Sequence, residues 1–324
     1  MGDDMLIPLG VAGLAIFGLA AWSAWVGTKA EDMVRADGEF LDLDGGCLHY
    51  VDTGPRDAPT IVMIHGILAQ LRNFSYAMLD DLAKDHRVVL IDRPGWGHST
   101  TIGRRPGIAR QAAMIHEALD RLEVSDPLLV GHSMGGAVSL AYALAYPSEI
   151  RGLALIAPFT QPTDQVPPMF KSLAVPPPLR PAIAWTLAVP IGMATGPAKA
   201  RDVFAPDAVP ADFATRAGGA LSIRPRSFQQ GAFELGIARD EAIAMAARYG
   251  EIAVPVAILY GKGDAVLDPE LHGRKTAEAI PGAKLTLIEG GHMLPITHAE
   301  TTLAWLREAD AAISPRPAES SIPG

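Results

Sequence analysis

Cysteine is almost absent from this chain, and so are the usual motifs for metals and nucleotides. The single cysteine, Cys47, excludes an internal disulfide framework and leaves the cellular compartment open. The sequence of 324 residues has no H-E-x-x-H motif, no G-x-x-x-x-G-K-[ST] loop and no cysteine cluster. We therefore predict neither a metal nor an organic cofactor.

Positive charge is scarce as well. The chain carries 27 Lys and Arg against 36 Asp and Glu, a net charge of -9. A nucleic-acid-binding protein needs a basic face to displace counterions from phosphates, so no nucleic-acid partner is predicted. Hydrophobic residues make up 49% of the sequence and charged residues 19%. This composition is that of a globular protein and excludes a largely disordered chain.

The N-terminal region contains a long run without any charge. Met5 to Val26 form 22 uncharged residues, which span about 33 Å as a helix and are long enough to cross a bilayer. Trp22 and Trp25 lie near the end of the run, where aromatic rings favour the membrane interface. We predict a single-pass transmembrane anchor within residues 1–30 and a membrane localisation, on a side that stays open. The alternative is a cleaved signal peptide, which two aspartates before the run disfavour.

A glycine-rich motif with a central serine follows an apolar run at residues 127–130. Its sequence is Gly131-His-Ser-Met-Gly-Gly136, with Ser133 at the centre. The pattern G-x-S-x-G is typical of a buried strand that turns sharply into a helix and carries a nucleophile at the turn. Small neighbours are required there because the two backbones nearly touch. The motif alone is common, so the surrounding sequence has to decide its meaning.

Apolar strands and helical segments alternate around this motif. Helices are predicted at 73–84, 108–122, 134–146, 269–280 and 301–312, with apolar residues at helical spacing over 108–122. A hairpin is predicted at 39–51, and buried strands are predicted at 60–64, 87–92, 127–130, 150–157, 254–260 and 284–289. Strands that alternate with helices of this length predict a mostly parallel, doubly wound α/β sheet.

Two more motifs stand directly after predicted strands. They are His65-Gly-Ile67 and Asp92-Arg-Pro-Gly-Trp-Gly-His-Ser99. Together with the motif at 131–136, in this order, they resemble the α/β-hydrolase fold family over residues 39–312. More narrowly, they resemble its small esterases, lipases and carbon–carbon bond hydrolases. Asp92 and His98 are interpreted as turn-stabilising residues.

The resemblance also has a limit. The epoxide hydrolases and haloalkane dehalogenases of this family carry aspartate at the nucleophile position, where this chain has Ser133. Neither activity is therefore part of the leading hypothesis.

The acid and the base of a triad are expected after later strands. Asp264 follows the strand at 254–260, and His292 follows the strand at 284–289 and two glycines. The family's acid and base positions match these two residues, and the order Ser, Asp, His is the one expected of the fold. Asp268 and His298 are the rival candidates.

The predicted oxyanion hole consists of two backbone N–H groups. They belong to Ile67, after the His-Gly turn, and to Met134, after the serine. The alternative interpretation of the His-Gly pair is a plain turn that ends a strand.

The alternation of strands and helices stops between residues 159 and 250. This segment is rich in proline, which argues against central strands, and in the family such an insertion resembles a helical lid. Apolar side chains at 179–193 either pack on the core or touch acyl chains. The predicted organisation is a transmembrane anchor (1–30), a hydrolase core in two parts (31–158 and 251–313), a lid (159–250) and a disordered tail (314–324).

These observations predict a serine hydrolase that cleaves carboxylic esters through an acyl-enzyme on Ser133. Lipid-like esters such as lysophospholipids or monoacylglycerols are favoured by the predicted anchor and lid, with the membrane as a partner through the N-terminal helix. The alternative within enzymes is a carbon–carbon bond hydrolase of ring-cleavage products. The alternative from another class is a non-catalytic binding or receptor protein on the same fold.

Overall fold

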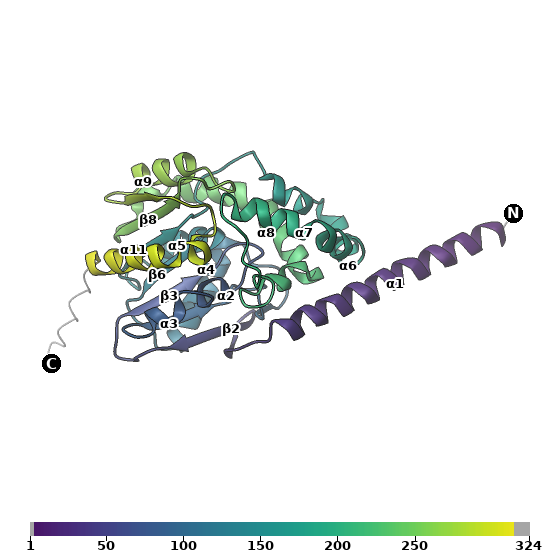
Figure 1. Ribbon diagram of the computed structural model, residues 1–324, viewed down its shortest axis with the longest axis horizontal. Coiled ribbons are helices and arrows are strands. Elements are labelled where there is room, and N and C mark those ends of the chain that lie inside the picture. The colour runs from purple at the N-terminus through teal and green to yellow at the C-terminus, as the bar shows by residue number, and fades with distance from the viewer. Residues whose placement is uncertain (1–2, 314–324) are drawn as a thin grey trace.

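In the described part of the chain, a single nine-stranded sheet forms the centre of the molecule (Figure 1). The computed structural model describes residues 3–313, with side-chain environments from residue 13 onward. The strand order is β1-β2-β4-β3-β6-β7-β8-β9, with β5 beside β2. The strands are β1 (Glu39–Leu43), β2 (Gly46–Thr53), β3 (Thr60–Ile64), β4 (Arg87–Ile91), β5 (Thr100–Thr101), β6 (Leu128–His132), β7 (Gly152–Ile156), β8 (Val256–Gly261) and β9 (Lys284–Ile288).

Neighbouring strands in the order β4-β3-β6-β7-β8-β9 pair in parallel, whereas β2 pairs antiparallel with β1, β4 and β5. Every residue of β3, β4, β6 and β7 is buried, because helices cover both faces of a parallel sheet. The mostly parallel sheet and the hairpin at its edge are thereby confirmed.

Successive side chains of a central strand enter two different cores. Val62 and Ile64 belong to a cluster that includes residues of α4 and α5. Ile61 and Met63 belong to a second cluster that includes residues of α2, α3 and α11. This alternation follows from the two-residue period of a strand. The helices over the two faces are α2 (Arg72–Ser75), α3 (Leu79–Leu82), α4 (Ile108–Arg121), α5 (Met134–Ala145), α9 (Lys275–Ala279), α10 (Leu294–Thr297) and α11 (Ala299–Ala312).

A helical cap connects β7 to β8 and comprises residues 157–255. Proline stands in the first turn of four of its helices, where its missing N–H costs no hydrogen bond. The prolines that exclude strands from this segment are thus compatible with short helices. The cap helices are η1 (Pro168–Leu173), η2 (Pro177–Leu179), α6 (Arg180–Thr186), α7 (Ala188–Phe204), η3 (Gly219–Ile223), α8 (Pro225–Ala246) and η4 (Tyr249–Glu251).

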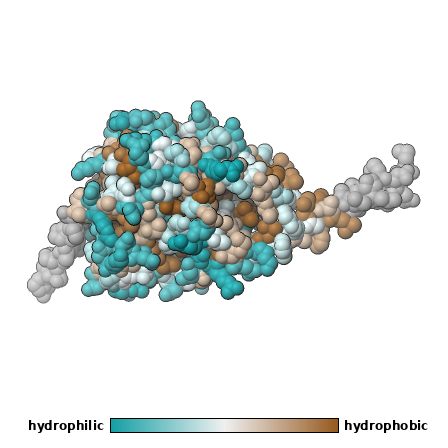
Figure 2. Space-filling model, in the orientation of Figure 1, coloured by the Kyte–Doolittle hydropathy of each residue, from teal (hydrophilic) through white to brown (hydrophobic). Residues whose placement is uncertain are grey.

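The N-terminal helix α1 (Asp3–Met33) docks on the cap through its last turns. Val26 and Ala30 are buried, and Ala30 shares a small apolar cluster with residues of η3. Glu31 forms an ion pair with Arg224 at 2.8 Å. Further toward the N-terminus α1 leaves the body of the molecule, and apolar side chains such as that of Phe17 are exposed (Figures 1 and 2).

The predicted transmembrane anchor is contradicted by this structure. Within the part of the chain that the structure describes, no helix is both long enough and apolar enough to span a bilayer. The last turns of α1 use their apolar residues to pack on the cap, and they carry charge from Lys29 onward. The membrane localisation and the membrane partner inferred from residues 1–30 are therefore not supported.

Two predicted helices differ in detail from the observed elements. The segment 73–84 forms two short helices, α2 and α3. Phe74 of α2, Met78 between the helices and Leu82 of α3 are buried at a four-residue spacing. The interruption between them therefore leaves the buried face intact. The segment 269–280 begins with the π-helical turn η5 (Pro269–Arg274) and continues as α9. The predicted disordered tail at 314–324 lies outside the described residues.

Candidate active site

Ser133 lies at a sharp turn between β6 and α5. Its backbone has φ 54° and ψ -122°, a conformation that L-residues rarely adopt and that costs free energy. Hydrogen bonds hold the turn: Ser133 N–H donates to Ile156 O at 3.1 Å, and Ser133 O accepts from the N–H groups of Gly136 and Phe159 at 2.9 Å each. A Cβ on Gly135 would collide with the carbonyl oxygen of Ile64. The glycine pattern of the motif is therefore a packing requirement of this turn.

The structure brings Asp264 and His292 together. Asp264 follows β8, and its Oδ2 lies 2.7 Å from His292 Nδ1. The other carboxylate oxygen accepts from the N–H groups of Val266 and Leu267 at 2.8 and 2.9 Å. A carboxylate only accepts, so Nδ1 of His292 carries the hydrogen and Nε2 of the neutral ring keeps a free lone pair. In this tautomer Nε2 is the ring nitrogen of His292 that can accept a proton.

The rival residues have other partners. Asp268 accepts from the N–H of Glu270 at 2.9 Å, at the start of η5. His298 lies 3.5 Å from the carboxylate of Asp207 and contacts the hydroxyl of Thr297. Both residues therefore serve local structure beside the site.

His132 links the turn of the serine to the loop of the base. Its Nε2 lies 3.0 Å from the carbonyl oxygen of His292, and because a carbonyl only accepts, Nε2 carries the hydrogen. Nδ1 is buried and has no hydrogen-bond partner in the described part of the chain. Burial, together with the nearby His292, lowers the pKa of His132 to about 3. This side chain is therefore a neutral tether, which the sequence reasoning missed because it treated the position as the variable residue of the motif.

The two predicted oxyanion donors stand beside the serine. A Cβ on Gly66 would lie 2.9 Å from Ser133 Cβ and 3.3 Å from Ser133 Oγ, so the loop with Ile67 passes directly against the nucleophile position. Met134 is the first residue of α5, where an N–H has no partner within the helix. This arrangement is compatible with two backbone donors at one acyl oxygen.

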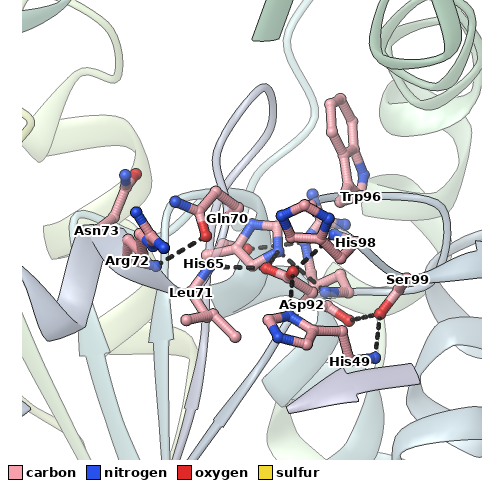
Figure 3. Close-up of polar contacts among 12 residues, drawn as sticks. His49, His65, Gln70, Leu71, Arg72, Asn73, Asp92, Trp96, His98 and Ser99 are labelled. Atoms are coloured by element: carbon pink, nitrogen blue, oxygen red, sulfur yellow. Dashed lines mark hydrogen bonds and ion pairs between the residues drawn. The ribbon is translucent and has the colours of Figure 1, made fainter. Parts of the chain in front are cut away.

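Asp92 organises the loop after β4 (Figure 3). Its fully buried carboxylate accepts from His49 Nδ1 and from the N–H of Leu71 at 2.8 Å, and from the N–H of His98 at 2.7 Å. Burial alone would raise the pKa of Asp92, but the hydrogen bond from His49 and the neighbouring His65 hold that pKa below its ordinary value. These contacts agree with the turn-stabilising role expected for Asp92 and His98.

A buried ion pair joins this loop to the cap. Arg93 Nη1 lies 2.9 Å from Glu234 Oε1, and Nη2 lies 3.1 Å from Oε2. Glu234 belongs to α8 and also accepts from Trp96, Gln111 and Gln230. Burial alone would raise the pKa of Glu234, but the Arg93 cation holds it below the ordinary range. The sequence gave no signal for this pair, because its members are 141 residues apart.

The site is enclosed. Ser133 is 6% exposed and His292 is 3% exposed, so both side chains are nearly buried. Ile67 and Leu68 pack against an apolar cluster of the cap that contains Leu173 and Phe228. Among the described residues, no group of three or more His, Cys, Asp or Glu side chains is arranged to hold a metal ion.

Comparisons with known proteins place the chain in a family. The family model described as alpha/beta hydrolase fold matches residues 59–299. The bifunctional esterase/perhydrolase DCH of Acinetobacter calcoaceticus is 31% identical over 277 residues, which cover 82% of this chain and 96% of that protein. The chain therefore belongs to the α/β-hydrolase fold family, and the resemblance stated from its sequence is confirmed at that level.

Two further similarities bear on fold and activity. A 2-hydroxy-6-oxononadienedioate/2-hydroxy-6-oxononatrienedioate hydrolase of Paraburkholderia phymatum is 37% identical over 137 residues, 39% of this chain and 46% of that protein. The crystal structure of an α/β-hydrolase fold protein from Burkholderia ambifaria superposes with a TM-score of 0.72 at 22% identity, covering 83% of this chain and 97% of that chain. The relatives support hydrolase activity for this chain.

Proposed function

We propose that this protein is a serine hydrolase that cleaves carboxylic esters. Ser133 is the nucleophile, His292 is the general base, and Asp264 orients and stabilises His292. The observation that carries the proposal is the hydrogen bond of 2.7 Å between Asp264 and His292. The His292 carbonyl oxygen is in turn bonded by His132, the residue before a serine held at a strained strand-to-helix turn. The filled acid and base positions disfavour the non-catalytic alternative, since a binding protein has no need of them.

The reaction proceeds through an acyl-enzyme. Ser133 Oγ attacks the acyl carbon while His292 Nε2 takes its proton, because a serine hydroxyl is protonated at neutral pH. The negative oxygen of the tetrahedral intermediate accepts from the N–H groups of Ile67 and Met134, each worth about 3–4 kcal/mol in comparable sites. His292 then gives the proton to the leaving alcohol. Water, activated by His292, releases the acid in the second half of the reaction.

The apolar cap favours a substrate with an apolar acyl group. Ile67 and Leu68 of the loop beside Ser133 pack with Leu173 and Phe228 of the cap, so the neighbourhood of the proposed oxyanion hole is apolar. Lipid-like esters, of the lysophospholipid or monoacylglycerol type, are the substrate class that we propose. The support for this class is now the cap alone, because the predicted anchor is contradicted.

A carbon–carbon bond hydrolase is the second candidate. The observation in its favour is the 37% identity over 137 residues to the dienedioate hydrolase named above. The same three residues serve such chemistry when a dicarbonyl compound replaces the ester. Activity on a dienoic diketo acid, without activity on p-nitrophenyl or glycerol esters, would reverse the order of the two candidates.

A fluorophosphonate probe tests the proposed nucleophile. Wild-type protein is expected to become labelled, and folded Ser133→Ala protein is expected to stay unlabelled. Folded wild-type protein that takes up no label would contradict the proposal and favour a binding protein.

A panel of acyl esters tests the substrate class. The esters have graded acyl chains, with and without a phospholipid headgroup. We expect kcat/KM to rise with acyl length, since each buried CH₂ contributes about 0.8 kcal/mol. A preference for short soluble esters would remove the lipid-like class and leave the serine hydrolase in place.

A further inference from the structure

One peptide group beside the nucleophile has a buried cation on its carbonyl side. The Gly66–Ile67 peptide presents the Ile67 N–H as a proposed oxyanion donor. Its other end, the Gly66 carbonyl oxygen, accepts from Arg93 Nη2 at 2.9 Å and lies 2.8 Å from His65 Nδ1. Arg93 Nε also donates to the carbonyl oxygen of His65 at 2.7 Å. The guanidinium therefore holds two consecutive carbonyls of this loop.

The protonation of His65 follows from its contacts. The backbone N–H of Arg93 donates to His65 Nε2 at 2.9 Å. His65 Nε2 therefore carries no hydrogen, and His65 Nδ1 donates to the Gly66 carbonyl oxygen. Burial, as the main cause, and the nearby Arg93 cation, as the second, lower the pKa of His65 to about 4, so the ring is neutral. The Gly66 carbonyl oxygen thus accepts two hydrogen bonds, which together fix the plane of the peptide.

A cation at the carbonyl strengthens the donor at the other end. Hydrogen bonds with an ionised partner are about twice as strong as neutral ones. A chain of hydrogen bonds polarises its members, each by about 10–30%. Electron density drawn toward the Gly66 oxygen makes the Ile67 N–H a better donor to a negative oxygen. The donor is also fixed before the reaction begins, which is what oxyanion stabilisation requires.

Glu234 keeps the cation in place. Both side chains are buried, at 0% exposure for Arg93 and 1% for Glu234, and a buried cation is costly without a paired anion. Glu234 comes from α8 of the cap, whereas Arg93 follows β4 of the core. The position of the cap is thereby coupled to the loop with the oxyanion donor.

We propose that Arg93 is a positioning residue for the oxyanion hole, acting through the Gly66–Ile67 peptide, and that Glu234 of the cap holds it there. The proposal rests on the proposed ester hydrolysis at Ser133. It assigns to the cap a part in the chemical step.

The main test is the double variant Arg93→Met/Glu234→Gln, which removes both buried charges. The amide oxygen at position 234 still accepts from Trp96, Gln111 and Gln230. We expect kcat on a p-nitrophenyl ester to fall about 10- to 100-fold, less than the 10²–10³-fold for deletion of a whole oxyanion donor. KM is expected to stay within about twofold, because the contact strengthens only as the oxygen becomes negative. The affinity for an alkylboronic acid, which forms a tetrahedral adduct with the serine, should fall in parallel.

A matched control lies at the other end of the same strand. Arg87, the first residue of β4, pairs with Asp52 at 2.8 Å, and both side chains are buried. It also donates to the carbonyl oxygens of Leu122 and Glu123. Arg87→Met/Asp52→Asn therefore removes a comparable pair and comparable carbonyl contacts. The pair lies at the start of β4, at the opposite edge of the sheet from Ser133, which follows the end of β6. We expect wild-type kcat and wild-type boronic acid affinity in this control.

The outcomes separate this inference from the proposed function. Wild-type kcat and boronic acid affinity in folded Arg93→Met/Glu234→Gln protein would overturn the inference, whereas wild-type protein without esterase activity or probe labelling overturns the proposed function itself. If the double variant does not fold, Arg93→Lys is measured in its place. An ammonium cannot span both carbonyls and Glu234 as the planar guanidinium does, so kcat and boronic acid affinity are expected to fall at unchanged KM. Wild-type values in Arg93→Lys would also overturn the inference.

Discussion

Gly66→Ala is the sharpest single test of the site, because Gly66 touches the proposed nucleophile. An added Cβ would lie 2.9 Å from Ser133 Cβ and 3.3 Å from Ser133 Oγ. The optimal van der Waals separation of two non-bonded carbon atoms is about 3.5–4.0 Å, so the loop and the serine must move apart by about 0.6 Å or more. Gly66 is not among the residues with positive φ, so alanine adds no backbone strain of its own at this position.

The expected effect follows from the geometric tolerance of an active site. Catalytic groups must be held to within about 0.5 Å, and a displacement of 1 Å can cost about 10²-fold in rate. We therefore expect Gly66→Ala to lower kcat about 10- to 100-fold and to leave KM within about threefold. Overpacking in a core costs about 1–3 kcal/mol, so the variant should fold with a reduced midpoint of thermal unfolding.

The assay combines steady-state hydrolysis of a p-nitrophenyl ester, the rate of fluorophosphonate labelling and thermal unfolding. Gly250→Ala is the control, since an added Cβ at Gly250 has no heavy atom within 4 Å. It should leave all three measurements unchanged. A folded Gly66→Ala protein with wild-type kcat and labelling rate would refute the placement of this loop against the reacting serine.

Three further predictions concern the groups around the base and one distant histidine. Asp264→Asn should lower kcat by about 10⁴-fold in ester hydrolysis, because an amide does not hold His292 in the required tautomer. His132→Leu should cost about 1–3 kcal/mol in urea unfolding by leaving the His292 carbonyl unpaired, and His132→Gln should restore most of it. The hydrogen bond that His86 donates to the Asp310 carboxylate, opposed by burial, raises the pKa of His86. Its stabilisation is therefore complete below the unfolded pKa of about 6.5 and is lost as pH rises through the higher folded pKa, so the stability gap between wild type and His86→Gln should shrink as pH rises above about 6.5.

The sheet was predictable from the sequence because its strands are apolar throughout. Thr60–Ile64 and Arg87–Ile91 are observed at or within one residue of their predicted bounds. The order of Ser133, Asp264 and His292 along the chain was predictable for a related reason. Residues that follow parallel strands meet at one edge of the sheet, whatever lies between them in the sequence.

Other features depended on contacts that no local pattern encodes. The segment 73–84 is predicted as one helical stretch, yet it forms two short helices. An uncharged run at the N-terminus has the length of a membrane span, but the last turns of α1 pack Val26 and Ala30 against the protein. Apolar residues can be buried either in a lipid bilayer or against another part of the protein, so hydropathy alone does not distinguish a membrane span from a packed helix.

The sequence by itself determined the family, the sheet and the three residues proposed for catalysis, because strand periodicity and glycine-rich turns are local properties. Only the tertiary structure decided that His132 tethers the base and that Arg93 holds the Gly66–Ile67 peptide. It also showed that Glu234 of the cap, 141 residues away, pairs with that arginine. Buried charges need partners in space, and folding alone selects which carboxylate of the chain arrives beside which cation.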